Sequence, residues 1–173
     1  TITVRLRSNN PNRNEYQNLF TLHYSINKKR YKTITIPNTT TSDYTKCTNK
    51  RCIICPITNT SKYLHSNTTN FYIRGNNTNT TCTNIGVIYL ITCKDCGIQY
   101  VGETCRSFKK RISEHIYNIR NKAENTELYR HFKNTGHQGI TVQIIDNITN
   151  QERSTRLNKE IYWIKLLQTI YPM

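Results

Sequence analysis

Four side chains suited to phosphate chemistry lie in one stretch, residues 86–115: Tyr89, Tyr100, Arg111 and His115. Hydrolysis of a phosphodiester needs an activated water, stabilisation of charge on the phosphoryl oxygens and help for the leaving oxygen. Arg111 can hold a phosphate oxygen through paired hydrogen bonds and stays charged throughout. Two tyrosines on a hairpin beside a helix with arginine and histidine therefore indicate a phosphodiester-cleaving site more than a packed core.

Hydrophobic periodicity predicts the segments that position these side chains. Residues 86–92 are apolar on both faces, like a central strand, and residues 99–103 form a second strand. Ser107 is expected to cap a basic helix that ends near Lys122. Its buried stripe is predicted to comprise Phe108, Ile112, Ile116 and Ile119. Arg111 and His115 share a neighbouring face, one turn apart, where they can border a cleft.

Three further elements follow. Residues 128–137 predict a short helix that breaks at Gly136, and residues 141–146 predict a third strand. Residues 151–169 predict a second long helix whose inward face comprises Leu157, Ile161, Ile164 and Leu167. The order of elements predicts an α+β domain: a small, mostly antiparallel three-stranded sheet flanked by helices.

Seven cysteines are present, and four of them precede the predicted domain: Cys47, Cys52, Cys55 and Cys82. They can close a four-thiolate tetrahedral metal site. Their segment is so polar that a metal would have to supply the missing folding free energy. The alternative, two disulfides, would include a strained small loop between Cys52 and Cys55. Zinc is the favoured interpretation.

The charge balance points to a polyanionic partner. Lys and Arg number 25 against 10 Asp and Glu, a formal net charge of +15, which suits nucleic acid or an anionic membrane surface. No apolar run approaches the roughly 20 residues that cross a bilayer, and no signal-peptide pattern opens the sequence. Asn-x-Ser/Thr triplets follow from the abundance of Asn and Thr. We therefore expect an intracellular chain with reduced thiols, and DNA contacts from Arg106, Lys109 and Lys110.

The sequence divides into three segments. Residues 1–45 read as an N-terminal linker or accessory segment, with short extended stretches around Ile2, Val4 and Leu6 and around Tyr31, Ile34 and Ile36. Residues 46–84 read as a Cys-rich zinc module, and residues 85–173 as the α+β domain. Because the chain opens with Thr1, we expect it to be part of a longer polypeptide.

The ordered motifs of residues 86–172 resemble the GIY-YIG nuclease family. Val87-Ile88-Tyr89, preceded by Gly86, matches the first signature, with Val in place of Gly before Ile-Tyr, and Tyr100-Val101-Gly102 matches the second. The Arg-x3-His of the helix and a downstream glutamate, Glu160, also match. The resemblance implies that Tyr89 is the general base, with His115 or Tyr100 lowering its effective pKa, and that Glu160 holds Mg²⁺ or Mn²⁺.

Within that family the sequence looks similar to the endonuclease domain of Penelope-like retroelements. Those domains carry a C-x2-C between the signatures and two downstream histidines, matched here by Cys93, Cys96, His131 and His137. Such ligands suit a closed, structural Cys₂His₂ zinc site; the alternative is an unligated turn with surface histidines. Cys105 belongs to neither group of ligands, and we expect it to be a small buried thiol or a contact near DNA.

That resemblance also implies partners and a location. The domain lies at the carboxyl end of a reverse transcriptase, so it implies a DNA target, a polymerase partner with its RNA, and a nuclear site of action without a membrane. Its nicks would prime reverse transcription. Family members of this kind continue past the final proline to an asparagine that borders the site, whereas this sequence ends at Pro172-Met173.

Two rival functions remain open. The first is a zinc-stabilised nucleic-acid-binding module with weak or unused catalysis, which the net charge and the two zinc sites would suit. The second is a disulfide-rich secreted protein that binds heparin-like polyanions. Retention of all five candidate catalytic residues argues for the endonuclease: Tyr89, Tyr100, Arg111, His115 and Glu160.

Overall fold

The computed structural model describes residues 2–4, 32–34, 44–148 and 152–169. The chain divides into two compact units, Thr1–Thr39 and Thr40–Met173. In the first unit, β1 (Ile2–Val4) pairs antiparallel with β2 (Lys32–Ile34); Leu6, Tyr31 and Ile36, also predicted as extended, lie outside the described residues. No helix in the described part is long and apolar enough to span a bilayer.

A three-stranded antiparallel sheet forms the centre of the second unit. Its order is β6 (Gln99–Thr104), β5 (Val87–Cys93) and β7 (Ile140–Asn147). The central position of β5 explains why six of its seven residues are buried, as its apolar pattern predicts. The register of β5 against β7 shifts between Ile88 and Tyr89. The predicted α+β class with an antiparallel sheet is confirmed.

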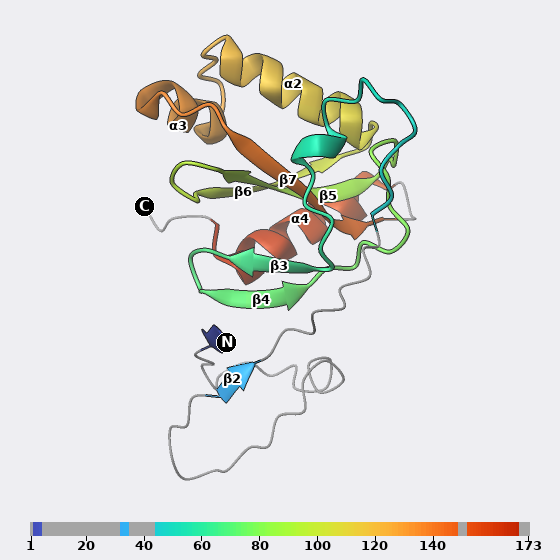
Figure 1. Cartoon of the computed structure of the whole chain (residues 1–173), viewed down its shortest axis with the longest axis vertical. Helices are drawn as coiled ribbons and strands as arrows, with labels where there is room; N and C mark the ends of the chain where they lie inside the picture. The colour runs from blue at the N-terminus through green and yellow to red at the C-terminus, as the bar shows by residue number, and fades with distance from the viewer. Residues whose placement is uncertain (1, 5–31, 35–43, 149–151, 170–173) are drawn as a thin grey trace. The chain divides into compact units, whose positions relative to one another are not determined.

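Two helices cover one face of this sheet (Figure 1). Helix α2 (Phe108–Arg120) begins where the sequence predicts, because the Ser107 side chain accepts a hydrogen bond from the Lys110 N–H. Helix α3 (Glu127–Thr135) ends at Gly136, which adopts φ 72° in the left-handed region. Residues from both helices join the sheet in one hydrophobic cluster, which includes Tyr89, Ile91, Phe108, Ile112 and Phe132.

The opposite face packs against α4 (Arg153–Leu167) and a small hairpin, β3 (Tyr63–Ser66) with β4 (Phe71–Arg74). Leu64 of the hairpin and Trp163 and Leu167 of α4 share a second cluster with Leu90 and Val101 of the sheet. Both faces of β5 are therefore packed against other elements, and this packing holds the strand and Tyr89 in place.

The Cys-rich segment contacts the sheet directly. It contains a short 3₁₀ helix, η1 (Cys55–Ile57), and its buried residues Cys52, Ile54 and Cys82 belong to the same cluster as Tyr89. Residues 46–84 and 85–173, distinguished by sequence pattern, thus lie in one compact unit.

The predicted inward face of α4 is partly wrong. Ile161 is 47% exposed, whereas Arg156 and Trp163 are buried, with exposed fractions of 5% and 1%. Both can be buried because each interacts with a carboxylate that is itself at least partly buried. Arg156 pairs with Glu103 at 2.9 Å, and the Trp163 indole donates to Asp146 at 3.0 Å. In α2, likewise, His115 is buried and Ile116 only partly so.

Candidate active site

Tyr89 lies at the centre of the candidate site and is completely buried. It projects from β5 across Gly102, its partner on β6. A Cβ atom at Gly102 would lie 2.5 Å from the Tyr89 hydroxyl oxygen and 2.6 Å from Cζ, far inside contact distance. The glycine of the Tyr-Val-Gly motif is thus required by space, because it lets the phenol pack directly against the neighbouring strand.

Two side chains of α2 converge on the Tyr89 hydroxyl. Arg111 donates from Nε at 3.1 Å, and His115 Nε2 lies within hydrogen-bond distance at 2.8 Å. Because these residues are one turn apart, both reach the same face of the sheet. The structure therefore brings together three of the residues that the sequence analysis selects, with Tyr89 as their common partner.

The protonation of these groups follows from burial and from Arg111. Burial raises the pKa of Tyr89, and the charge and hydrogen bond of Arg111 oppose that rise. Of the two residues expected to lower the pKa of Tyr89, Tyr100 acts in the opposite direction, and His115 is the one within hydrogen-bond distance of the hydroxyl. Burial, and then the Arg111 charge, lower the pKa of His115 to about 4. At neutral pH His115 is therefore uncharged, and it acts on Tyr89 through its hydrogen bond.

Tyr100 and Glu160 complete the predicted set from β6 and α4. The Tyr100 ring lies edge-on to His115, with centroids 6.3 Å apart. Burial, then the charge of Glu160, raise the pKa of Tyr100. Burial and the neighbouring carboxylate of Glu103 raise the pKa of Glu160. The half-buried Glu160 carboxylate, with a second carboxylate beside it, is a hard oxygen ligand of the kind that Mg²⁺ prefers.

The partner of Arg156 differs from the one the helix spacing suggests. An i−4 pair with Glu160 is the simplest expectation, but the Arg156 guanidinium instead donates to Glu103 at 2.9 Å. The Glu103 side chain is 22% exposed. This arrangement places a neutralising charge on the carboxylate next to Glu160, and it was not visible in the sequence because Glu103 and Arg156 lie on separate elements.

The basic residues near the site differ in accessibility. Arg106 and Lys110 are exposed and Lys109 is partly exposed, so all three predicted DNA contacts can meet a ligand. Arg106 already forms an ion pair with Glu114, whose other carboxylate oxygen lies 3.2 Å from Arg111 Nη1. Glu114 thus joins two arginines and is absent from the sequence prediction, although its i+3 spacing from Arg111 was a signal for it.

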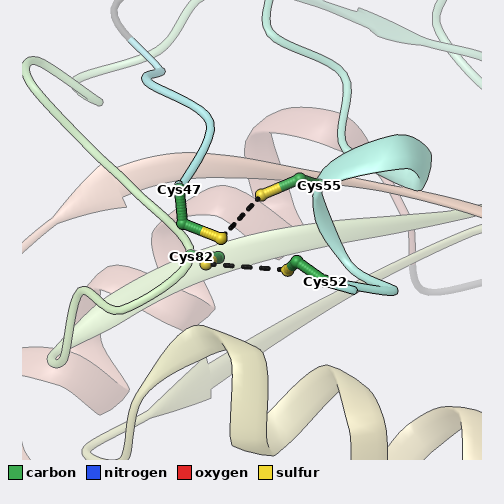
Figure 2. Close-up of side chains that lie close together, drawn as sticks. All are labelled: Cys47, Cys52, Cys55 and Cys82. Carbon is green, nitrogen blue, oxygen red and sulfur yellow. Dashed lines mark hydrogen bonds between the residues drawn. The ribbon is translucent and has the colours of Figure 1, made fainter. Parts of the chain in front are cut away.

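Four cysteine sulfurs gather between η1 and the sheet (Figure 2). Cys47 and Cys55 are 3.6 Å apart at Sγ, Cys52 and Cys82 are 4.0 Å apart, and all four sulfurs lie within 4.8 Å of one another. A tetrahedral zinc ion about 2.3 Å from each sulfur separates its ligands by about 3.8 Å. The geometry fits zinc, and none of the four forms a disulfide.

A second group combines sulfur and imidazole ligands. Cys93 Sγ lies 3.4 Å from His137 Nδ1, and Cys96 Sγ lies 3.5 Å from His131 Nε2. All four ligand atoms are mutually within 4.8 Å, so these residues also fit a tetrahedral zinc ion. Such a site would clip the turn between β5 and β6 to the end of α3. Cys105, the seventh cysteine, is exposed, which excludes the buried thiol, one of its two expected roles; the contact near DNA stays a prediction.

Two residues that the sequence analysis missed extend the site. The hydroxyl of Tyr129, on α3, lies 2.7 Å from His115 Nδ1, and Asn118 Nδ2 donates to that hydroxyl at 3.2 Å. Tyr129 is 3% exposed. With 12 tyrosines in the chain and no spacing rule that links α3 to His115, no signal in the sequence singles it out.

Comparison with known proteins gave one family match and one similar solved structure. A family model described as the GIY-YIG catalytic domain matches residues 85–171, half of the 173-residue chain. A solved structure of the catalytic domain of the homing endonuclease I-TevI is similar at 25% identity, over 48% of this chain and 88% of that chain, with a TM-score of 0.42. No curated protein matches. The family match spans every element that positions the site, from β5 to α4.

Proposed function

The chain belongs to the GIY-YIG family of nuclease domains, and from this premise we propose that it is a Mg²⁺-dependent DNA endonuclease that nicks one strand at each encounter. The observation that carries the proposal is the convergence of Arg111 and His115 on the buried hydroxyl of Tyr89. A packed core has no need to surround one phenol with a cation and a neutral imidazole.

In the proposed reaction Tyr89 first releases its own proton to solvent, and the resulting phenolate then removes a proton from the attacking water. A phenol titrates near 10 in water, and burial raises the pKa of Tyr89 further, so its phenolate depends on donors. Arg111 supplies one of them through Nε, and its Nη atoms can hold a phosphate oxygen. DNA would compete with Glu114 for those atoms, because Glu114 Oε1 lies 3.2 Å from Arg111 Nη1.

Glu160 is the proposed metal ligand. Its half-buried carboxylate lies close enough to Glu103 for the Glu103 charge to raise the pKa of Glu160, after burial itself, and a divalent cation would relieve that repulsion. Mg²⁺, or Mn²⁺ in its place, would stabilise charge on the phosphoryl oxygens when bound. Arg156, by pairing with Glu103, leaves the negative potential concentrated at Glu160.

The two cysteine-containing groups are proposed as structural zinc sites. Both are closed sets of four ligands with no position for a water molecule, which is typical of structural zinc. The Cys₄ group would anchor residues 47–82 to the sheet, and the Cys₂His₂ group would anchor α3. Zinc binding would then contribute directly to the free energy of folding.

The biological setting is a proposal that rests on the resemblance to Penelope-like retroelements. A C-x2-C between the two signatures, two downstream histidines and a preceding cysteine cluster support it. In that setting the domain would act in the nucleus beside a reverse transcriptase and its RNA, and its nick would expose a 3′ end for priming. The large positive charge suits both nucleic acids.

One observation favours a second candidate, a zinc-stabilised DNA-binding module with weak catalysis. Tyr89 is 0% exposed, and burial raises its pKa, so the base is neither accessible nor ionised in the free protein. On this view the basic surface would bind DNA without cutting it.

A nicking assay on supercoiled plasmid separates the two candidates. Wild type and Glu160→Ala are compared with Mg²⁺ and with Mn²⁺, and DNA binding is measured by fluorescence anisotropy. We expect metal-dependent nicking by wild type, loss of at least about a hundredfold in the variant, and similar binding by both. Zinc-loaded, DNA-binding wild type that does not nick would establish the binding module instead.

A further inference from the structure

A shielded series of hydrogen bonds runs from Asn118 to Tyr89 through α2, α3 and β5. Asn118 Nδ2 donates to the Tyr129 hydroxyl, that hydroxyl meets His115 Nδ1 at 2.7 Å, and His115 Nε2 meets the Tyr89 hydroxyl at 2.8 Å. His115, Tyr129 and Tyr89 are 2%, 3% and 0% exposed. Water does not compete for these atoms, so the side chains themselves decide where each proton lies.

Two proton arrangements satisfy this series. Neutral imidazole has one N–H and one bare nitrogen, and the low pKa of His115 keeps it neutral at pH 7. In the first arrangement, Tyr89 donates to Nε2 and Nδ1–H donates to Tyr129. In the second, Tyr129 donates to Nδ1 and Nε2–H donates to Tyr89. Only in the second does the Tyr89 oxygen accept from both His115 and Arg111.

Asn118 distinguishes these arrangements. Because its amide already donates to the Tyr129 oxygen, the first arrangement would give that oxygen two donors and leave the Tyr129 proton without an acceptor among the residues that the structure describes. An unpaired buried donor carries the full cost of its desolvation. The second arrangement uses the Tyr129 proton and leaves the Tyr89 proton unpaired instead. Once Tyr89 loses that proton to act as base, every donor in the second arrangement has an acceptor, which the first arrangement cannot achieve.

We propose that Tyr129, held by Asn118, is a positioning residue that fixes His115 as the Nε2–H tautomer, so that His115 and Arg111 both donate to the Tyr89 oxygen. Two donors favour the charged form of their acceptor, so this tautomer promotes ionisation of Tyr89. The inference deepens the proposed role of Tyr89 as general base and rests on it. Tyr129 does not touch the reacting atoms; it acts through His115.

Nitrogen-15 NMR of the imidazole rings tests the tautomer without any assay of cleavage. The sequence contains five histidines, and the His115 ring is assigned by its disappearance in His115→Gln. We expect zinc-loaded wild type at pH 7 to show a protonated Nε2 and a bare Nδ1. Tyr129→Phe removes only the hydroxyl and should shift the ring toward the Nδ1–H form. Tyr117→Phe, at an exposed position of the same α2, should change nothing.

The kinetics of nicking of supercoiled plasmid provide the second readout. Loss of one neutral hydrogen bond predicts a fall in kcat of about two- to tenfold, with KM and zinc content unchanged. A wild-type Nδ1–H tautomer, or an unaltered His115 spectrum in Tyr129→Phe, would overturn the inference. If Tyr129→Phe fails to fold, the spectrum of Asn118→Ala decides, because it removes the donor to Tyr129. Absence of nicking by wild type would refute the nuclease proposal, while the ring spectrum would still decide the tautomer.

Discussion

Gly102 lies directly against the phenol of Tyr89, with room for a hydrogen atom and none for a methyl group. The two residues are cross-strand partners in the β5–β6 hairpin. The closeness of this pair fixes how far the Tyr89 hydroxyl extends toward α2, and hence its distances to Arg111 and His115.

Gly102→Ala should therefore displace the Tyr89 hydroxyl and reduce nicking by about tenfold or more. Overpacking of this kind also costs about 1–3 kcal/mol in the free energy of unfolding, measurable by urea titration. Gly139→Ala is the matched control, because a Cβ there would meet Lys94 Cβ and Cδ at 3.2 Å, a far milder contact than the 2.5 Å at Gly102. Equal activity of Gly102→Ala and wild type would show that the hydroxyl position is not critical.

Tyr89→Phe retains the buried ring and removes the general base. General-base catalysis contributes about 10²–10⁴-fold, so kcat should fall by that order while DNA affinity stays the same. Single-turnover nicking with saturating protein measures the effect, and Tyr117→Phe at an exposed position of α2 controls for loss of a phenol. A residual rate within threefold of wild type would assign the base to another group.

His115 makes stability depend on pH. Its folded pKa of about 4 lies below the unfolded value near 6.5, so the unfolded chain binds more protons between these values. Its contribution is complete above about pH 6.5 and is lost as pH falls toward 4, on the order of 3 kcal/mol in total. Urea titrations between pH 7 and pH 4 should show this loss in wild type. The slope should be smaller in His115→Gln, and equal slopes would contradict the assignment.

Glu114→Gln should strengthen DNA binding severalfold. The substitution frees Arg106 and Arg111 from their shared carboxylate, so two more cationic groups become available to phosphates. Fluorescence anisotropy across a salt series measures affinity and its salt dependence, which should steepen. Glu127→Gln, on a side chain 81% exposed and paired with Arg130, controls for the change in net charge. Identical affinities of the two variants would exclude a specific role for Glu114.

His137→Ala should lower zinc content and stability together. Removal of one of four ligands opens the Cys₂His₂ group, so the bound zinc should fall by one equivalent and Tm by about 5 °C or more. Metal analysis by mass spectrometry and a thermal melt check this. His65→Ala, a histidine outside both groups, should retain its zinc. Normal zinc stoichiometry in His137→Ala would remove the proposed site.

The sequence predicts the sheet, its antiparallel pairing and the start of α2 because these depend on local patterns. Apolar residues on both faces mark β5 as central, and Ser107 marks the helix start. The buried face of α4 could not be predicted in the same way. Arg156 and Trp163 are buried by partners on β6 and β7, and periodicity carries no information about such partners.

In the candidate site, too, the residues in local motifs could be predicted from the sequence and those placed by tertiary contacts could not. Tyr89, Arg111 and His115 belong to motifs with fixed spacing, so the sequence identifies them. Tyr129 reaches His115 from a separate helix, and its role depends on how α3 packs on α2. Residues that act through tertiary contacts alone have no spacing by which to find them.

The order of the sheet has a consequence for how the site assembles. Strands β5 and β6 are joined by a short turn, whereas β7 reaches β5 only after α2 and α3 have intervened. Closing the shorter loop costs less chain entropy, so local pairing is kinetically favoured over distant pairing. Tyr89 and Gly102 both lie on that local hairpin. We therefore expect the phenol to pack against its glycine early in folding, before the helices that supply its hydrogen-bond donors have docked.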